Sequence, residues 1–470
     1  MLGFSNQSIA NFLFWVTRKK WLITTFIVSL YLFYIPTPEG LSSEGHRTLI
    51  IAITTLILIV SESIQLPAIA ILILIMEVIL GIDSPDGVAS SFMSDAVFFI
   101  MGSLMLAVAI VHQGWDKRIA LGIIKITGNK TQNIIFGFLL ISAIMASFIG
   151  EHTVAAIMLP IAISLVRYTS SDKKKVKNLA SVLLFSIAYG ALIGSVGTPS
   201  GGGRNVIMLG YLKDSNLFIS YLEWMIQVYP FILVQIPIVS WILIKSFPPE
   251  YIHLDTSVRK LVVQVAKSAS ITRSNIIAGL IFLLVFLGWI FFSETFGLGT
   301  IALIGVFLFL VAGYVEWDYL SKHTHWGVIL LFGSTISLGS NIKSTGAAEW
   351  LANIIVNFMG NIFESFPFIG DTVIIIMTTT MANVLSSSAT VAVLGPITMN
   401  MGENTLQLGL ITAIASAFGY FTAIAAPACT IIYSSGLVSA KDFLKVGWKV
   451  GLISIGLLVL YKNTYWALFN

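Results

Sequence analysis

The chain has 470 residues, of which 57% are apolar and only 10% are charged, against about 25% in soluble domains. This composition excludes an ordinary water-soluble enzyme. Each bilayer crossing takes roughly 20 mostly apolar residues, so the chain has room for roughly ten to twelve crossings with short loops. The net charge of +4 does not indicate a nucleic-acid partner, because Lys and Arg lie in short segments and form no extended basic face. We therefore predict a polytopic α-helical membrane protein.

The first apolar run, 21–35, follows the basic cluster Arg18–Lys20. A signal peptide has this pattern, but no small-residue cleavage site follows in 36–39, so we expect a retained first helix. Because basic residues mark the cytoplasmic side of a membrane protein, the N-terminus is predicted to be cytoplasmic.

A polar break interrupts the next long apolar segment of interest. This segment, 131–166, lies between two basic stretches, 116–130 and 173–177, that are both expected on the cytoplasmic side. Its middle carries Gly150-Glu151-His152-Thr153. A segment that leaves and returns to one face in this way forms either two short spans or a re-entrant helical hairpin, with its polar backbone buried in protein or lining a wet cavity.

The second half of the chain repeats this pattern. Three pairs of segments correspond at a separation of about half the chain: 98–114 with 330–346, 159–161 with 395–397, and 197–199 with 425–427. Acidic residues (Glu364, Asp371, Glu403) flank the second hairpin where basic residues flank the first, so we expect the second to open to the outside. An inverted repeat with two broken segments is typical of a secondary transporter whose binding site lies at the midplane.

The two hairpin tips carry the strongest candidates for chemistry. An ionisable side chain in a membrane segment costs at least ~2.5 kcal/mol on insertion scales, so Glu151 and His152 are expected to be functional; the alternative is a pair that only closes a turn. The second tip carries Ser386 to Ser388, whose oxygens suit Na⁺ and whose N–H groups suit an anion. The alternative for this run is helix packing, but its position in a duplicated break favours a site.

A glycine-rich break at 197–205 interrupts a further apolar segment. It lacks the Lys-Ser/Thr end of a phosphate-binding loop, so we do not expect nucleotide binding. Its Arg204 would attract a carboxylate or sulfate, or else extend to the membrane interface. The single Cys429 excludes intramolecular disulfides and CxxC clusters, and the other histidines lack metal-ligand spacing, so no cofactor is predicted.

These motifs resemble the divalent anion:sodium symporter family (DASS). The hairpin tips of that family carry a Ser-Asn-Thr signature before a proline turn, and alignment on Pro160 and Pro396 places 150–152 and 386–388 on the two signatures. Here Glu151 and Ser387 stand at the two Asn positions, and His152 stands at the first Thr position. Segments 325–351 and 433–447 resemble the helix before the second hairpin and the C-terminal signature.

The resemblance implies a homodimer whose protomers each have a scaffold domain and a transport domain that moves as an elevator. It implies Na⁺ as the coupling ion, with a first cation site at Gly150, Glu151 and Gly197 and a second at Ser386, Ser387 and Ala425. The anion is expected between the tips. With Arg204 included, the predicted substrate-binding residues are Glu151, His152, Thr198, Pro199, Arg204, Ser387, Ser388 and Pro427.

The predicted architecture is all-α, with about 11 transmembrane helices and two re-entrant hairpins in an inverted repeat. The expected segments in chain order are N-terminal scaffold helices (1–94), a first repeat (95–245) with its hairpin at 131–167, an amphipathic cytoplasmic linker (246–275), scaffold helices (276–325), and a second repeat (326–470) with its hairpin at 361–400.

The predicted function is Na⁺ symport of a C4-dicarboxylate such as succinate, fumarate or malate, across the inner (plasma) membrane. Because a buried Glu beside a His also suits proton transfer, H⁺ coupling is an alternative, as is a sulfate or organosulfonate substrate. An anion channel has less support, because the sequence shows no charged pore ring or carbonyl filter. A membrane enzyme would need a nucleophile and a base, and only Glu151-His152 comes near such a pair.

Overall fold

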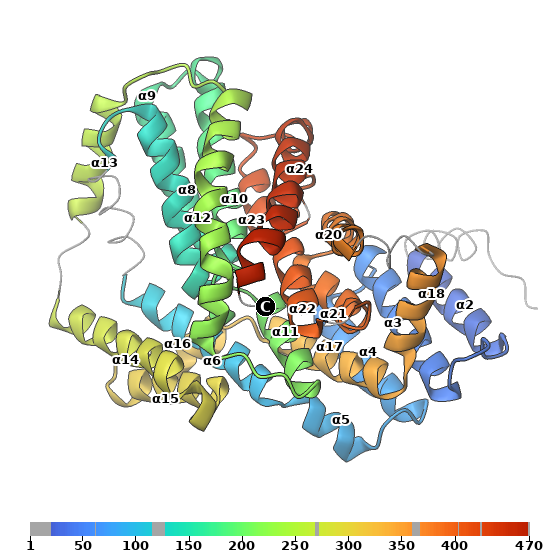
Figure 1. Cartoon of the computed structure of the whole chain (residues 1–470). Coiled ribbons are helices and arrows are strands. Elements are labelled where there is room, and N and C mark those ends of the chain that lie inside the picture. The colour runs from blue at the N-terminus through green and yellow to red at the C-terminus, as the bar shows by residue number, and fades with distance from the viewer. Residues whose placement is uncertain are drawn as a thin grey trace, which may run out of the picture. The chain divides into compact units, whose positions relative to one another are not determined.

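The computed structural model describes residues 20–61, 63–114, 127–267, 272–359, 367–402, 404–423 and 425–468. Their regular structure is helical, with one isolated β-bridge between Lys130 and His253 (Figure 1). The predicted all-α membrane architecture is therefore confirmed. Glu364, Glu403, the basic stretch at 116–125 and the N-terminal residues Arg18 and Lys19 lie outside the described residues.

Seven described helices are long and apolar enough to cross a membrane, and six shorter apolar helices accompany them. The long helices are α6 (Asp95–His112), α8 (Thr131–Ile149), α9 (Glu151–Thr169), α10 (Lys177–Gly194), α12 (Tyr221–Ser246), α14 (Arg273–Phe296) and α24 (Ala440–Thr464). The hydrocarbon core of a bilayer requires that backbone N–H and C=O groups are paired internally, and a helix pairs them while its apolar side chains face lipid or protein.

The chain divides into two compact units: the first contains residues 1–93 and 326–358, and the second contains 94–325 and 359–470. The helices of the first unit are α2 (Lys20–Tyr34), α3 (Ser43–Ser61), α4 (Leu66–Ile79), α5 (Pro85–Phe92), α17 (Trp326–Ser344) and α18 (Ala347–Met359). Helix α17 packs against α3, α4 and α5. Buried Leu58, Ile69, Ile73 and Leu338 form part of the apolar core of this unit.

An ionisable residue lies inside the first unit. Glu77 of α4 is fully buried and accepts hydrogen bonds from the Ser337 hydroxyl (2.8 Å) and the Asn341 side-chain amide (3.1 Å), both on α17. These bonds satisfy a polar group that apolar surroundings would otherwise penalise. Sequence reasoning missed Glu77, although an ionisable residue in an apolar helix is a signal in itself.

The second unit contains both predicted hairpins. The first consists of α8 and α9, which meet at Gly150, and it ends two residues later than predicted, at Thr169. The second consists of α20 (Pro367–Val384) and α21 (Ser387–Thr398), which meet at Leu385 and Ser386; the predicted start at 361–366 lies outside the described residues. Each hairpin is followed by a helix that breaks and resumes after an irregular segment.

The broken segments have the same design in both halves. Helix α10 stops at Gly194, a short 3₁₀ turn η2 (Pro199–Gly201) follows, and α11 (Gly203–Asp214) continues the chain. Helix α22 (Thr405–Ala415) stops similarly, and α23 (Pro427–Ser434) follows the second break. The proline at the start of η2 and of α23 suits this position, because the first helical turn does not need its N–H.

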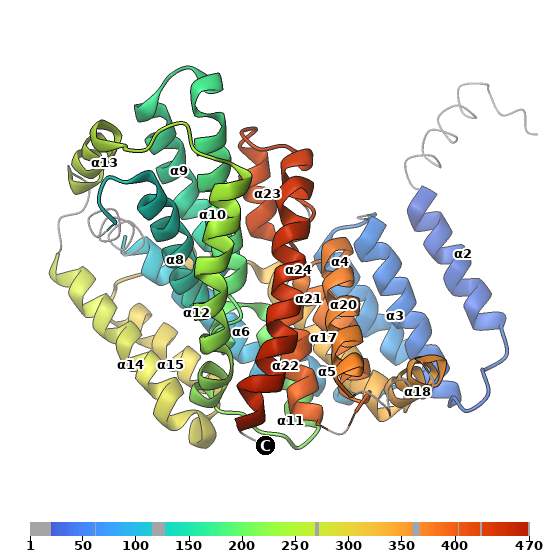
Figure 2. The same cartoon turned by 45° about the horizontal axis from the view of Figure 1, so that its top comes forward.

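The hairpins and broken helices pack reciprocally. The first arm of each hairpin contacts the broken helix of its own half: α8 lies on α10, and α20 lies on α22. The second arm of each contacts the helix that follows the break of the other half: α9 lies on α23, and α21 lies on α11. In Figures 1 and 2 the two hairpins form separate groups within this unit.

Small residues permit the close packing of the first group. A Cβ atom on Gly194 of α10 would lie 1.9 Å from the backbone oxygen of Ala143 on α8, and one on Gly190 would lie 2.4 Å from that of Leu139. Glycines at helix contacts are typical of membrane proteins, because close approach replaces the hydrophobic driving force that lipid does not supply.

The remaining helices of the second unit each contact one or two of the helices named above. They are α13 (Asp255–Lys267), α15 (Leu298–Val311), α16 (Trp317–His323) and the short turns η1 (Lys173–Val176) and η3 (Trp466–Leu468). The predicted linker thus contains a helix, α13, which packs against α9. The segment just before α13 contacts the start of the first hairpin, where the Thr131 hydroxyl donates to the backbone oxygen of Tyr251 (2.6 Å).

Candidate functional site

The first hairpin tip is a single glycine between two helices. Gly150 has φ +81° and ψ 151°, a conformation that essentially only glycine adopts without strain, so α8 ends and α9 begins across one residue. Glu151 is the first residue of α9 and is 9% exposed. A carboxylate at the first turn of a helix is stabilised by the N–H groups and the dipole of that helix.

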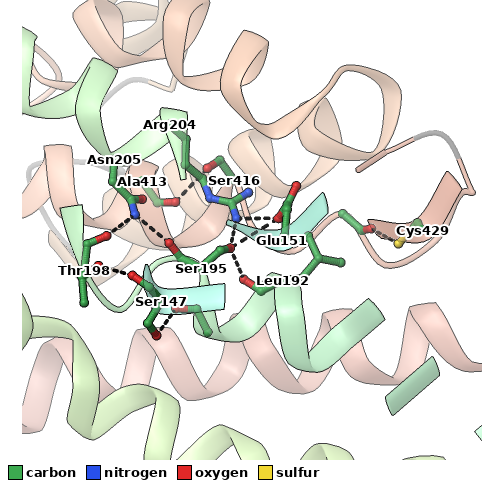
Figure 3. A network of polar contacts seen from close by, with 12 residues as sticks. Ser147, Glu151, Leu192, Ser195, Thr198, Arg204, Asn205, Ala413, Ser416 and Cys429 are labelled. Atoms are coloured by element: carbon green, nitrogen blue, oxygen red, sulfur yellow. Dashed lines mark hydrogen bonds and ion pairs between the residues drawn. The ribbon is translucent and has the colours of Figure 1, made fainter. Parts of the chain in front are cut away.

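A buried ion pair joins this tip to the glycine-rich break (Figure 3). Nη2 of Arg204 lies 2.9 Å from Oε2 of Glu151, and Arg204 is only 2% exposed. The same Nη2 also donates to the hydroxyl of Ser195, which in turn donates to Oε2 of Glu151 (3.3 Å). Arg204 therefore does not extend to an interface, and the two opposite charges neutralise each other inside the protein.

The Arg204 side chain retains one unsatisfied donor. Among the described residues, Nε of Arg204 is buried without a hydrogen-bond partner. Arg204 lies in the first turn of α11, directly after two glycines, and a Cβ atom on Gly202 would lie 3.6 Å from Nε. Such a Cβ atom would be in ordinary van der Waals contact with the guanidinium, which thus lies close to this glycine segment.

The first break is held in shape by its own polar groups. The side-chain amide of Asn205 donates to the backbone oxygens of Ser195 and Thr198, at 2.7 Å each. The Thr198 hydroxyl donates to the backbone oxygen of Ser147 on α8, and the Ser147 hydroxyl donates to the Gly194 oxygen (2.7 Å). Gly201 allows the tight turn, since a Cβ atom there would lie 2.4 Å from the Ser195 oxygen.

The second tip carries hydroxyls and no described charge. Ser386 caps α21, and its hydroxyl accepts from the backbone N–H of Ala389 (3.3 Å). Ser387 begins α21 and is 4% exposed, but its hydroxyl has no hydrogen-bond partner within the part of the chain that the structure describes. Ser388 is half-buried. A buried hydroxyl without a partner is costly unless a ligand satisfies it.

Asn383 connects the second tip to the second break. Its side-chain amide donates to the backbone oxygen of Phe418 (3.0 Å), and its Oδ1 accepts from the backbone N–H of Phe421 (2.7 Å). The hydroxyl of Thr422 donates to the Asn383 backbone oxygen (3.1 Å). In each half, therefore, a threonine of the break donates to the backbone oxygen three residues before the tip: Thr198 to Ser147, and Thr422 to Asn383.

The other predicted residues occupy different surroundings. His152 is half-buried, and its ring packs edge-on against that of His325, with 5.1 Å between the centroids. Pro199 and Ala425 are buried, whereas Pro427 is exposed at the start of α23. A Cβ atom on Gly197 would lie 2.9 Å from the Ser147 hydroxyl. No hydrogen bond or ion pair between described residues joins 150–152 to 386–388.

Several polar residues that shape this region were missed by sequence reasoning, namely Ser147, Ser195, Asn205, Asn383 and Thr422. All of them lie within a few residues of a break in an apolar helix. A search for small polar side chains next to such breaks could have found them, because the freed backbone groups there need partners.

A separate apolar cavity can be excluded as the anion site. It has a volume of about 550 Å³ and lies between α6, α8 and α14, with a lining that includes Ile110, Met145, Phe148 and Phe286. Its lining residues carry no polar side chain, so it offers nothing to a carboxylate or sulfate. Within the described ranges, no group of three or more His, Cys, Asp and Glu could hold a metal ion.

The chain is similar to transporters over nearly all of its length. An uncharacterized transporter of Haemophilus influenzae is 27% identical over 461 residues, which cover 94% of this chain and 96% of the relative. Sodium-dependent dicarboxylate transporters named SdcS are also similar: that of Staphylococcus saprophyticus is 26% identical over 93% of this chain and 88% of the relative, and that of Staphylococcus aureus is 25% identical over the same shares.

The fold is similar to that of a solved transporter. The crystal structure of the YdaH transporter of Alcanivorax borkumensis aligns with a TM-score of 0.51 over 79% of this chain and 85% of that chain, at 10% identity. The model of the sodium:sulfate symporter transmembrane region matches residues 17–470. The chain thus belongs to the sodium:sulfate symporter family, which confirms the resemblance to divalent anion:sodium symporters, and it is a multi-pass membrane transporter of that family.

Proposed function

We propose that the protein is a secondary carrier that moves a C4-dicarboxylate such as succinate, fumarate or malate together with Na⁺. The observation that carries the proposal is the reciprocal packing of two hairpins on two helix breaks, with α9 on α23 and α21 on α11. This arrangement provides two equivalent sets of helix ends, as expected of an inverted repeat with a central binding site. The names of the Staphylococcus relatives support the substrate class.

The proposed anion site lies between the tips and the breaks. Helices α9, α11, α21 and α23 begin at the tips or directly after the breaks, and the free N–H groups of a helix N-terminus attract anions. Further donors are the hydroxyls of Thr198, Ser387 and Ser388 and the ring of His152. Pro199 and Pro427 would line the same site. The Glu151–Arg204 pair contributes no net charge, so the two charges of a dicarboxylate require added cations.

The proposed coupling ion at the second tip is Na⁺, held by Ser386, Ser387 and the backbone near Ala425. The unpartnered, buried Ser387 hydroxyl supports this assignment, because a hard cation would satisfy its oxygen. The first predicted cation site, at Gly150, Glu151 and Gly197, has different surroundings, because the Arg204 guanidinium contacts Glu151 there. We propose no cofactor besides the coupling ion.

We further propose an elevator mechanism in a homodimer in the inner (plasma) membrane, with a cytoplasmic N-terminus. The family membership supports the mechanism and the dimer, and the basic cluster Arg18–Lys20 supports the orientation.

The test is uptake of labelled succinate into proteoliposomes, with Na⁺ and pH gradients imposed separately and unlabelled sulfate as competitor. We expect uptake that an inward Na⁺ gradient drives and that sulfate inhibits weakly. Uptake driven only by the pH gradient would establish H⁺ coupling instead, and strong inhibition by sulfate would make sulfate or an organosulfonate the substrate. No uptake under either gradient would contradict the dicarboxylate proposal, and empty liposomes provide the control.

A further inference from the structure

We propose that the guanidinium of Arg204 is a tethered cation that takes the place of a Na⁺ at the first hairpin tip, so that the carrier binds one Na⁺ fewer than its two predicted sites would allow. The proposal rests on the proposed function for the existence of two equivalent cation positions. It is carried by the buried contact of Arg204 with Glu151 and by the state of the surrounding oxygens.

The charge of Glu151 is the first difference from an open Na⁺ site. A carboxylate at the tip would strengthen a Na⁺ site only while its charge is available. The charge of Glu151 is already balanced by Nη2 of Arg204 at 2.9 Å, with both side chains buried. A Na⁺ beside this pair would face the guanidinium at short range in apolar surroundings, where like charges repel strongly. Binding of a further cation is therefore disfavoured.

A Na⁺ site also needs several oxygen ligands whose lone pairs are free. The backbone oxygens of the first break already accept hydrogen bonds within the protein, whereas Oδ1 of Asn205 is buried without a partner among the described residues. The backbone oxygens of Ser195 and Thr198 accept from Asn205, and the Gly194 oxygen accepts from the Ser147 hydroxyl and the Gly197 N–H. The Ser195 hydroxyl oxygen accepts from Arg204 itself. The guanidinium thus bonds to two oxygens that a cation at this tip would use, Oε2 of Glu151 and the Ser195 hydroxyl.

The space around the first break is also restricted. Backbone atoms crowd the glycines of the break: a Cβ atom on Gly201 would lie 2.4 Å from the Ser195 oxygen and 3.0 Å from the oxygens of Ala146 and Ser147. On the other side, a Cβ atom on Gly150 would lie 3.4 Å from the His152 ring. The tight approach of backbone oxygens around Gly201 leaves little room for a further ion on that side of the break.

The second tip differs from the first in its charge and in one side-chain oxygen. Its hydroxyl at Ser387 is buried and without a partner, and no ion pair among the described residues reaches 386–388. The same position in the two halves therefore holds a fixed cation in one and an unsatisfied oxygen in the other. A diffusible cation is needed only at the second tip. A tethered charge also cannot dissociate, so it adds nothing to the coupling of transport to the Na⁺ gradient.

The test is the number of ²²Na⁺ ions bound per purified chain at saturating Na⁺. We expect Arg204→Gln to bind one Na⁺ more than the wild type, because the Glu151 carboxylate and the oxygens around it become available. Arg204→Lys, which keeps a tethered charge, should match the wild type. The double variant Glu151→Gln/Arg204→Gln removes the carboxylate as well and should not gain the ion.

Equal Na⁺ binding by the wild type and Arg204→Gln would overturn the proposal. So would a loss of succinate binding in Arg204→Gln without a gain of Na⁺, which would assign Arg204 to the substrate. If Arg204→Gln does not fold, the wild type decides: one Na⁺ per chain is expected, and two would overturn the proposal. This comparison needs no transport, so a failure of succinate uptake would remove the proposed function and leave the Na⁺ count as a separate result.

Discussion

The two hairpin tips occupy equivalent places in the fold but differ in chemistry. The first tip places a carboxylate against a guanidinium, both buried, and the backbone oxygens of Ser195 and Thr198 in its break accept hydrogen bonds from Asn205. The second tip presents serines, one of them with a buried hydroxyl that lacks a partner among the described residues. One duplicated framework can therefore hold a permanent cation at one end and leave the other end free to bind one.

The hydrogen bonds that join each tip to its break are more alike than the side chains of the two tips. In each half a threonine of the break donates to the backbone oxygen three residues before the tip. Backbone oxygens at a helix break are free to accept, since the helix no longer satisfies them. The framework is thus set by backbone geometry, and the side chains at the tips can vary without changing it.

The largest expected effect comes from breaking the ion pair. Glu151→Gln and Arg204→Gln should each lower the free energy of unfolding by ~3–5 kcal/mol in Na⁺-free buffer, because each leaves a buried charge unpaired. The double variant should lose less than the sum of the two, with a coupling of ~1–3 kcal/mol. Thermal unfolding of the detergent-solubilised protein measures all three. Additive losses would mean that the two charges do not interact as the geometry indicates.

A smaller effect on stability is expected when the hydrogen bonds that join a tip to its break are removed. Asn383→Ala removes three hydrogen bonds, to Thr379, Phe418 and Phe421, and should cost ~2–4 kcal/mol of unfolding free energy, since the Phe421 N–H is left without an acceptor. Ser147→Ala should cost only ~1 kcal/mol, because the Gly194 oxygen still accepts from the Gly197 N–H. The same unfolding measurement compares the two variants. A larger loss in Ser147→Ala would reverse the assignment.

The backbone of the first tip can be tested separately. Gly150→Ala should cost ~1–3 kcal/mol, because φ +81° with ψ 151° is strained for any residue with a Cβ atom. The matched change at the second tip, Ser386→Gly, should cost only a few tenths of a kcal/mol (~0.3), as glycine is tolerated at a helix N-cap. Thermal unfolding reports both. If Gly150→Ala has no effect, the tip must adopt another backbone conformation.

The smallest effect on stability, and the most informative for transport, is expected at Ser387. Ser387→Ala should change the unfolding free energy by less than ~0.5 kcal/mol, because the hydroxyl makes no described hydrogen bond to lose. The Na⁺ concentration for half-maximal succinate uptake should rise about tenfold, equivalent to ~1.4 kcal/mol of Na⁺ binding. Ser186→Ala, whose hydroxyl bonds to its own helix at Val182 (2.7 Å), is the control and should leave this concentration unchanged. An unchanged value in Ser387→Ala would remove Ser387 from the cation site.

The helical fold and the place of the tips could be predicted from the sequence because a membrane imposes strict local rules. Apolar runs of this length must be helices, and a polar break such as Gly150-Glu151-His152 within one must be sheltered by protein. The breaks at 197–199 and 425–427 follow from the same reasoning and from the duplication. The family resemblance rests on these same local motifs, and the match over residues 17–470 confirms it.

The partners of the polar residues could not be predicted in this way. Glu151 pairs with Arg204, 53 residues away, and Glu77 is satisfied by Ser337, 260 residues away. The first pair depends on how α9 lies relative to α11, and the second on how α4 packs against α17; a single sequence carries no signal for either arrangement. The adjacent residue His152, which suggested a pair with Glu151, packs instead against His325.

By itself, the sequence determined that the chain is a helical membrane transporter with polar breaks at two duplicated positions, because the bilayer penalises every exposed polar group and so makes each exception visible. Only the tertiary structure decided what those exceptions do. It paired one scarce charge, Glu151, with another, Arg204, and left the Ser387 hydroxyl unsatisfied. The physical reason is that the cost of a buried polar group is local, whereas the partner that offsets this cost is chosen by long-range packing.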